Sequence, residues 1–252
     1  MPSPSREPLR RFLGGLRSAG QEVLDLLLPA RCQLCDAPAH GLHDQILCEG
    51  CANAWPLIEA GCRCCGRPGV DAGASCPGCL QSPPPFDRAR ALALYEGKVI
   101  DAVQALKYQG RRGLAPLLGK WMAEALPGLL EATRYQYIVP VPMHWQRRIW
   151  RGYNQAELLA QAIGRRLNIP VELEMRRLRA APRQVRLGLK ERQDNTAGLF
   201  AVSAAAKRRL SGARVLMIDD VFTTGATTGA CSFTLKAAGV AGVDVFTLAR
   251  TP

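Results

Sequence analysis

Long apolar runs are absent from this chain of 252 residues, and their absence narrows the classes of protein to which it can belong. Crossing a bilayer takes about 18 consecutive apolar residues, and no stretch approaches that length, so we expect no membrane span. The first twenty residues, MPSPSREPLRRFLGGLRSAG, also lack the continuous apolar centre of a secretion signal, because Arg, Pro and Gly interrupt them. We therefore expect a cytoplasmic protein.

The chain also lacks the composition of a disordered protein. Hydrophobic residues make up 48% of it and charged residues 21%, which is enough for one large domain or for a small and a medium one. Residues 1–29 are predicted to form an amphipathic helix or a tail. Their Arg and Ser content faintly resembles a transit peptide, and the acids Glu7, Glu22 and Asp25 argue against that alternative.

Positive charge is unevenly distributed along the chain, whose net charge is +12. Residues 1–80 contain seven Arg against eight acids, whereas residues 134–192 contain thirteen Lys or Arg against four acids, a net of +9. Such a concentration indicates a polyanionic partner, either nucleic acid or a phosphate-rich small molecule. A solvated basic face explains it equally well.

Eight of the ten cysteines form four Cys-x-x-Cys pairs within residues 32–79. In a reducing compartment this spacing favours metal over disulfides, and two such pairs complete a closed four-cysteine zinc site. We therefore predict two structural zinc ions, held by Cys32, Cys35, Cys48, Cys51, Cys62, Cys65, Cys76 and Cys79. Sequential pairing gives a double zinc ribbon, and an interleaved arrangement fits the count as well.

Other ligands and other chemistries compete for these cysteines. His40 or His43 is able to replace a thiolate, and Cys64 lies beside the third pair as a spare thiol. Redox-active cysteine pairs and an iron–sulfur cluster are the remaining alternatives, because thiolate spacing does not name the metal. A closed site offers no open coordination position, so the segment is expected to hold shape or bind a partner.

The segment QSPPPFDRAR predicts a domain boundary near residues 81–86, since three consecutive prolines make a stiff connector. We expect a double zinc ribbon at 30–80 and a second domain at 87–252. In the second domain, strands are predicted at 89–95, 135–142, 213–220 and 242–250, and helices at 97–110, 113–130, 154–167 and 226–239. Asn154 is the expected N-cap of the third helix. The alternation predicts an α/β fold with a mostly parallel sheet flanked by helices.

The stretch VLMIDDVFTTGATTGA, residues 215–230, is the strongest functional signal. Its apolar start is typical of a central parallel strand, and open α/β sheets bind ligands at the carboxyl ends of such strands. The Thr and Gly loop before a helix offers hydroxyls and backbone N–H groups to a phosphate. Asp219 and Asp220 would repel a phosphate and instead suit the neutral hydroxyls of a ribose. Together they describe a site for a ribose 5-phosphate.

A nucleotide-hydrolysing P-loop protein is the main competitor, because LMIDD also resembles its second acidic motif. That class requires G-x-x-x-x-G-K followed by Ser or Thr. The Gly-Lys pairs of this chain, at 97–98 and 119–120, are followed by Val99 and Trp121. The sequence therefore disfavours this class.

Residues 215–228 resemble the phosphoribosyl pyrophosphate signature of type I phosphoribosyltransferases. Together with LKYQGRR (106–112), VPVPMHWQRRIWRGYNQAELLA (139–160), RQVRLGLKERQDNTAGLF (183–200) and the cysteine pairs, they resemble the ComF/GntX family of competence-associated phosphoribosyltransferase-like proteins. The resemblance covers about residues 30 to 250. It implies a type I phosphoribosyltransferase-like sheet behind the zinc ribbon.

The resemblance also implies roles for individual residues. Asp219 and Asp220 match the ribose-binding acids of a catalytic site that takes phosphoribosyl pyrophosphate with Mg²⁺. The 5-phosphate loop would comprise Thr223, Thr224, Gly225, Ala226 and Thr227. Basic residues expected near the ligand are Lys107, Arg111, Arg147, Arg148 and Arg151. A cover loop would supply Arg183, Gln184, Arg192 and Asn195.

Two functions remain open at this point. The resemblance implies a phosphoribosyl transfer in which an acceptor nitrogen displaces pyrophosphate, in a protein associated with DNA uptake and natural transformation. The alternative is a non-catalytic adaptor that binds single-stranded nucleic acid and works beside a helicase-like competence protein. Trp145, Trp150 and Tyr153 interleave with arginines as stacking residues do, although buried aromatics would give the same pattern.

Overall fold

A computed structural model of the chain describes residues 31–39, 46–71, 73–178 and 198–252. By its internal contacts the chain divides into two units, Met1–Asn53 and Ala54–Pro252. Three groups of residues named in the sequence analysis lie outside the described residues. They are the segment 1–29, the alternative ligands His40 and His43, and the predicted cover loop residues Arg183, Gln184, Arg192 and Asn195. The domain bounds at residues 80 and 87 stay a prediction.

The first unit is a short cysteine-bearing fold. A bridge joins Arg31 and Pro38, and a tight turn between them carries the first cysteine pair. Helix α2 (Glu49–Asn53) carries the last cysteine of the unit, Cys51, on its buried side. Backbone hydrogen bonds within the turn bring its two ends together, from Cys32 N to Ala37 O (2.8 Å) and from Asp36 N to Cys32 O (2.9 Å).

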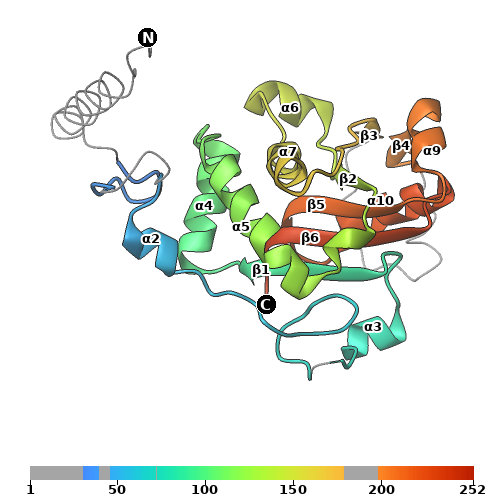
Figure 1. Cartoon of the computed structure of the whole chain (residues 1–252), viewed down its shortest axis with the longest axis horizontal. Helices are drawn as coiled ribbons and strands as arrows, with labels where there is room; N and C mark the ends of the chain where they lie inside the picture. Colours follow the sequence, from blue (N-terminus) through green and yellow to red (C-terminus); the bar gives the residue numbers. More distant parts are fainter. Residues whose placement is uncertain (1–30, 40–45, 72, 179–197) are drawn as a thin grey trace, which may run out of the picture. The chain divides into compact units, whose positions relative to one another are not determined.

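The second unit is built on a parallel four-stranded sheet in the order β1-β6-β5-β2 (Figure 1). The strands are β1 (Arg88–Leu94), β2 (Tyr137–Pro140), β5 (Arg214–Phe222) and β6 (Gly242–Arg250). β6 is buried at every position, as expected for a central parallel strand covered on both faces. The α/β class predicted from the sequence is therefore confirmed.

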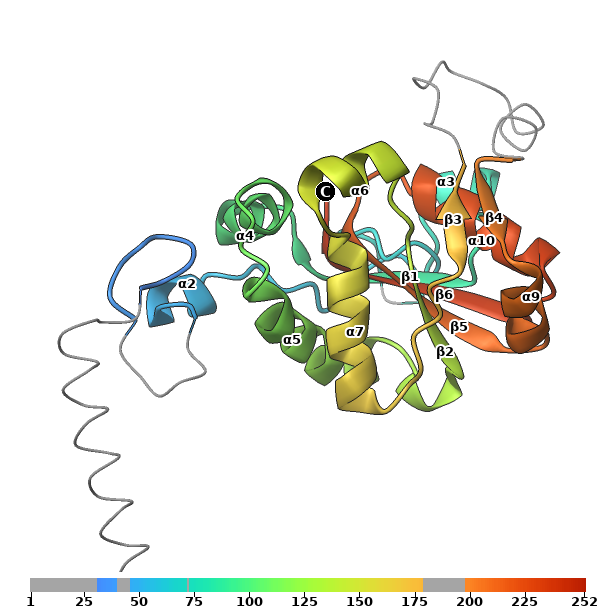
Figure 2. The same cartoon turned by 90° about the horizontal axis from the view of Figure 1, so that it is seen from above.

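Helices cover both faces of this sheet (Figures 1 and 2). α4 (Gly97–Tyr108), α5 (Leu114–Leu129) and α7 (Gln155–Leu167) lie on one side, and α10 (Ala226–Ala237) lies on the other. The interface of α5 with α7 depends on Gly119, because a Cβ there would approach the Ala162 Cβ to 2.4 Å. Asn154 caps α7 as predicted, accepting a hydrogen bond from Ala156 N at 3.1 Å.

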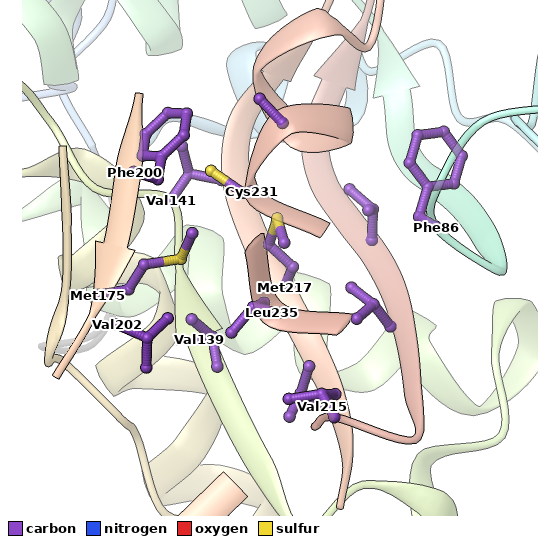
Figure 3. Packing of buried hydrophobic residues seen from close by; sticks show 14 of the residues in the cluster. Phe86, Val139, Val141, Met175, Phe200, Val202, Val215, Met217, Cys231 and Leu235 are labelled. Atoms are coloured by element: carbon purple, nitrogen blue, oxygen red, sulfur yellow. The ribbon is translucent and has the colours of Figure 1, made fainter. Parts of the chain in front are cut away.

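The core beneath α10 is formed by alternate residues of the strands (Figure 3). Val139, Val215 and Met217 point from β2 and β5 toward Cys231 and Leu235 of the helix. Fully burying one side chain of this size stabilises the fold by about 1.5–3 kcal/mol. Because successive strand residues face opposite sides, the intervening positions meet α5 and α7.

Several elements were not foreseen from the sequence. α6 (Trp145–Arg151), α9 (Ala204–Leu210) and the antiparallel pair β3 (Met175–Arg177) and β4 (Phe200–Val202) belong to the second unit. β5 also runs two residues further than predicted and ends at Phe222. Asp219 and Asp220 therefore lie inside a strand that remains paired with β6.

The second four-cysteine segment belongs to the same unit as the sheet. Helix α3 (Pro77–Gln81) ends it, and the prolines that follow lead directly into β1. These prolines pack on the domain, since a Cβ on Gly229 would lie 3.5 Å from Pro85, and Phe86 is buried. In the part of the chain that the structure describes, no helix is long and apolar enough to cross a membrane.

Candidate functional site

The acid pair lies where the sheet opens. β2 pairs with β5 only from Tyr137 to Pro140, opposite Val215 to Ile218, and its last contact is Val141 N with Ile218 O at 2.8 Å. Beyond this point β2 leaves and β5 continues alone on that side through Asp219 and Asp220. A parallel sheet that loses a neighbouring strand in this way leaves room for a ligand at its carboxyl edge.

Lys107 reaches Asp220 from a distant part of the chain. Its Nζ lies 2.7 Å from the Asp220 Oδ1, and both side chains are mostly buried. Lys107 stands in the last turn of α4, where the helix dipole also favours a cation. Of the basic residues predicted near the ligand, this one is brought directly to the acid pair.

Asp219 has different surroundings from its neighbour. It accepts a hydrogen bond from the Asp220 backbone N–H at 2.8 Å. Burial, followed by the negative charge of Asp220, raises the pKa of Asp219 to about 8, against the opposing effects of Lys107 and Arg177. A carboxyl group with this pKa is mostly protonated, and therefore uncharged, at physiological pH. A cation or a hydroxyl donor that approaches it favours the carboxylate form, which is the stronger hydrogen-bond acceptor.

The threonine loop joins β5 to α10. Thr223 and Thr224 are exposed, and Gly225 is the N-cap of α10 with a φ of 75°. Thr224 Oγ1 lies 3.4 Å from Ala226 N, and Thr228 Oγ1 donates to Gly225 O at 3.1 Å. The side chains of Ala226 and Thr227 stand at the helix start beside them, Ala226 exposed and Thr227 half-buried. The loop thus presents hydroxyls and helix N–H groups to solvent, which is the donor set that phosphate sites use.

Three of the arginines predicted near the ligand lie on α6 and differ in their contacts. Arg148 forms an ion pair with Glu157 at 3.0 Å. Arg151 donates to Gln155 Oε1 at 2.8 Å and lies over the Tyr108 ring, 5.0 Å from its centroid. Arg147 is exposed.

Arg177 was missed by the sequence analysis. It ends β3, lies 5.5 Å from the centroid of the Phe200 ring, and shares the electrostatic environment of Asp219 and Arg147. Burial lowers the pKa of Arg177, and the negative charge of Asp219 opposes this. The signal for it was weak, since a three-residue strand beside the predicted cover loop has no distinctive pattern.

Helix α6 exposes its aromatic residues. Trp145 and Trp150 are 57% and 73% exposed, and Ile149 between them is 74% exposed. Tyr153 is buried instead, and its hydroxyl donates to Leu106 O at 2.6 Å. Buried aromatics therefore explain Tyr153, whereas the two tryptophans face solvent among arginines.

The cysteines form two separate clusters with sequential pairing. Cys32, Cys35, Cys48 and Cys51 make one, and Cys62, Cys65, Cys76 and Cys79 make the other, with the sulfur atoms of each cluster within 4.8 Å of one another. The interleaved arrangement is thus excluded, and Cys64 takes no place in the second cluster.

One sulfur atom in each cluster accepts a backbone hydrogen bond that favours its thiolate form. Cys62 Sγ accepts from Cys76 N at 3.2 Å, and Cys32 Sγ accepts from Leu34 N at 3.4 Å. Burial raises the pKa of the Cys62 thiol, but backbone N–H groups outweigh it and the pKa falls to about 6. Four thiolates in a closed group fit structural zinc in both clusters.

Comparison with known proteins agrees with this arrangement. The double zinc ribbon domain matches residues 23–80. DNA utilization protein YhgH of Escherichia coli (strain K12) is 32% identical over 231 residues, which cover 90% of this chain and 99% of that protein. Competence protein F of Haemophilus influenzae is 30% identical over 224 residues, or 87% of this chain and 96% of that protein.

Among solved structures, the glutamine phosphoribosylpyrophosphate amidotransferase of B. subtilis aligns at 19% identity with a TM-score of 0.41, over 57% of this chain and 30% of that chain. The curated relatives provide the assignment, because their identity extends over nearly their whole length. The chain therefore belongs to the ComF/YhgH competence family, with a double zinc ribbon at its N-terminal end.

Proposed function

We propose that this protein binds phosphoribosyl pyrophosphate with Mg²⁺ at the open edge of β5 and acts as a phosphoribosyltransferase in DNA uptake. The observation that carries the proposal is the meeting of three features at one edge. They are the acid pair, Lys107 at 2.7 Å from Asp220, and the exposed threonine loop at the start of α10. A ligand with a phosphate at one end and a diol at the other matches all three.

The 5-phosphate occupies the loop from Thr223 to Thr227 in this proposal. Gly225 lets the backbone turn there, and the N–H groups of the first turn of α10 donate to the phosphate oxygens. The ribose hydroxyls donate to Asp219 and Asp220, which lie on β5 and are separated from the loop by Val221 and Phe222. The loop and the acids would thus bind opposite ends of a ribose 5-phosphate, the phosphate and the hydroxyls.

The acid pair also suits the metal. Carboxylate oxygens are the ligands that Mg²⁺ prefers, and a bound cation would offset both the burial and the repulsion from Asp220 that raise the pKa of Asp219. When bound there, Mg²⁺ would neutralise part of the negative charge of the diphosphate. Lys107, with its Nζ 2.7 Å from the Asp220 Oδ1, places a positive charge beside the acid pair.

The arginines of α6 complete the proposed transfer. The bond from the anomeric carbon to the pyrophosphate oxygen breaks, and a bond from that carbon to an acceptor nitrogen forms as the nitrogen loses its proton. Arg147 is exposed and free to turn toward the departing diphosphate, whereas Arg148 would first leave Glu157. Bidentate guanidinium groups stabilise the developing charge on such a leaving group.

The place of the reaction in DNA uptake follows from the relatives. Proteins 30–32% identical over nearly their whole length are named for DNA utilization and for competence. We extend that role to this chain. The substrate nitrogen then belongs to a base or nucleotide made available when DNA is taken up.

Calorimetric titration with phosphoribosyl pyrophosphate and Mg²⁺ tests the proposal. Asp220→Asn removes a charged acceptor and should weaken binding about ten- to hundredfold. Asp101→Asn is the matched control, because Asp101 is a half-exposed acid that pairs with Lys98 on α4. Equal affinity in wild type and Asp220→Asn, or no heat in the zinc-loaded wild type, would overturn it.

A second function, binding of single-stranded nucleic acid, is favoured by one observation. Trp145 and Trp150 are exposed on α6 beside Arg147 and Arg148, which combines stacking surfaces with phosphate-binding charges. Each stacked base is worth about 1–3 kcal/mol.

Tryptophan fluorescence separates this function from the first. Oligothymidylate should quench the emission of wild type and lose affinity as salt rises from about 50 to 200 mM. Trp145→Ala/Trp150→Ala should lose the quenching and keep the affinity for phosphoribosyl pyrophosphate. The remaining tryptophans, Trp55 and Trp121, pack edge to face with each other at 5.1 Å and report folding as an internal control. Quenching that persists in the double variant would exclude α6 as the binding surface.

A further inference from the structure

The second four-cysteine cluster is attached to the sheet through its backbone carbonyls. Ala89 N of β1 donates to Cys64 O at 2.7 Å, and Arg90 Nη1 donates to Cys62 O at 3.3 Å. Arg250 Nη1, from the end of β6, donates to Cys65 O. The turn that carries Cys62 and Cys65 is therefore held by two arginines from neighbouring strands.

Arg250 is a buried cation with a second contact. It pairs in register with Phe222 of β5 on one side and Leu94 of β1 on the other, and the residue is 5% exposed. Its guanidinium carbon lies 4.9 Å from the centroid of the Phe222 ring. A buried guanidinium depends on its acceptors and on such a ring to offset its lost hydration.

Phe222 in turn packs against the loop that follows it. A Cβ on Gly225 would lie 2.6 Å from the Phe222 Cζ, so the ring fills the space beside the glycine. Phe86 also packs on this ring edge to face, with centroids 5.9 Å apart. The loop conformation at Gly225, with its φ of 75°, thus rests on the position of this ring.

We infer that Arg250 and Phe222 are positioning residues through which the second cysteine cluster holds the loop Thr223–Thr227 in its ligand-binding conformation. The inference rests on the proposed function, since it takes this loop as the phosphate site. Loss of metal from Cys62, Cys65, Cys76 and Cys79 releases the turn and moves the Cys65 carbonyl. Arg250 then loses the acceptor of its Nη1 and keeps only the bond from its Nε to Thr251 O (3.2 Å). Its guanidinium leaves the Phe222 ring, and the ring no longer supports Gly225.

The coupling acts in both directions. If an intact cluster favours the loop conformation that binds ligand, ligand bound at the loop must favour the intact cluster by the same factor. Phosphoribosyl pyrophosphate should therefore raise the concentration of a chromogenic chelator that is needed at equilibrium to remove zinc from the second cluster. In this inference the second cluster contributes to ligand binding without being part of the ligand site.

Hydrogen exchange of the zinc-loaded full chain, followed by mass spectrometry on peptides covering residues 223–229, tests the link without any ligand. Cys79→Ser removes one ligand of the cluster. Arg250→Met keeps all four cysteines and breaks only the connection, so it remains informative if Cys79→Ser folds poorly. Arg90→Met is the matched control. Arg90 also donates to this turn, but the described contact with the Phe222 ring comes from Arg250.

Exchange in residues 223–229 should become about tenfold faster in Cys79→Ser and in Arg250→Met, and stay unchanged in Arg90→Met. The double variant Cys79→Ser/Arg250→Met should be no faster than either single variant, since both act on one connection. Unchanged exchange in Arg250→Met, or additive effects in the double variant, would overturn the inference.

Calorimetry on the same proteins separates this inference from the proposed function. Arg250→Met should bind phosphoribosyl pyrophosphate about tenfold more weakly than wild type. If the wild type gives no binding heat but Arg250→Met still exchanges faster than wild type, the proposed ligand is refuted and the link is supported. A wild type that binds, together with an Arg250→Met of equal affinity and exchange, refutes the link and leaves the ligand.

Discussion

Asp219 and Asp220 are adjacent in one strand, and the fold gives them different partners. Asp220 forms an ion pair with Lys107 at 2.7 Å. Asp219 receives one backbone hydrogen bond, and burial with the charge of Asp220 raises its pKa. One acid is thereby paired with a protein cation, whereas burial disfavours the charged form of the other.

The raised pKa of Asp219 makes stability depend on pH. The folded protein holds this proton more tightly than the unfolded chain, so the group contributes stability at acidic pH that is lost as pH rises toward about 8. Asp219→Asn carries no such charge. We expect urea unfolding to give the variant an advantage over wild type that grows between about pH 4 and pH 8 and levels off above it. A difference between the two that is constant over this range would contradict the assignment.

Gly225 is the residue whose backbone the loop depends on most. Its φ of 75° costs a residue with a Cβ about 1–2 kcal/mol, and the Cβ would also meet the Phe222 ring. Gly225→Ala should therefore lower the melting temperature by a few degrees and weaken phosphoribosyl pyrophosphate binding.

Gly229 provides the control for that substitution on the same helix. A Cβ there meets only ordinary contacts with Pro85 at 3.5 Å, and alanine is the better helix former. Gly229→Ala should keep or raise the melting temperature and leave binding unchanged. Equal effects of the two alanines would remove the special role of Gly225.

At the scale of elements, the sequence predicted those parts whose pattern is set by a buried face. The four sheet strands and the helices α4, α5, α7 and α10 lie where their apolar periodicity placed them. α6 was missed because no residue of it is buried, so no apolar stripe marks it. β3 and β4 were missed because three-residue strands carry too few positions to show alternation.

The candidate site divides in the same way. Its acids and threonine loop are contiguous in the sequence, which is why a motif reveals them. Lys107 and Arg177 come from elements far from the motif in the sequence, and only the fold places Lys107 against Asp220 and Arg177 within the electrostatic environment of Asp219. Lys107 was anticipated through the family resemblance, whereas Arg177 had no pattern to indicate it.

Helix α7 gives an element-scale prediction. Asn154 accepts from Ala156 N at its start, and its amide donates to Val141 O at 3.0 Å, joining the helix to the end of β2. Asn154→Ala should cost about 1–2 kcal/mol in the free energy of unfolding by urea. Asn168→Gly at the other end should cost little, because Asn168 has a φ of 55° that glycine adopts freely. A neutral Asn154→Ala would show that other contacts fix the start of α7.

On the scale of the whole molecule, charge and metal are segregated. The cysteine segment is nearly neutral in sequence, and the basic residues gather in 134–192. Four thiolates and one zinc add a charge of about −2 to each cluster, so zinc loading makes the contrast sharper. The polyanion-binding surface is therefore expected on the sheet domain, with the ribbons serving structure.

Zinc content reports the pairing of the cysteines. Wild type should bind two zinc ions per chain, and Cys32→Ser/Cys51→Ser should keep one, because both residues belong to one cluster. In an interleaved arrangement these two cysteines would belong to different sites, and the double variant would keep no zinc ion. Cys64→Ser should keep both ions, since Cys64 lies outside the second cluster. Elemental analysis by mass spectrometry after gel filtration measures these ratios.

The central claim concerns one site, at the open edge of β5. A crystal structure of the zinc-loaded protein with phosphoribosyl pyrophosphate and Mg²⁺ examines it most directly. We predict the 5-phosphate oxygens at about 3 Å from the backbone nitrogens of Gly225 to Thr227, with the ribose hydroxyls on Asp219 and Asp220. A ligand bound only to the arginines of α6, or a site that stays empty at saturating ligand, would contradict the account.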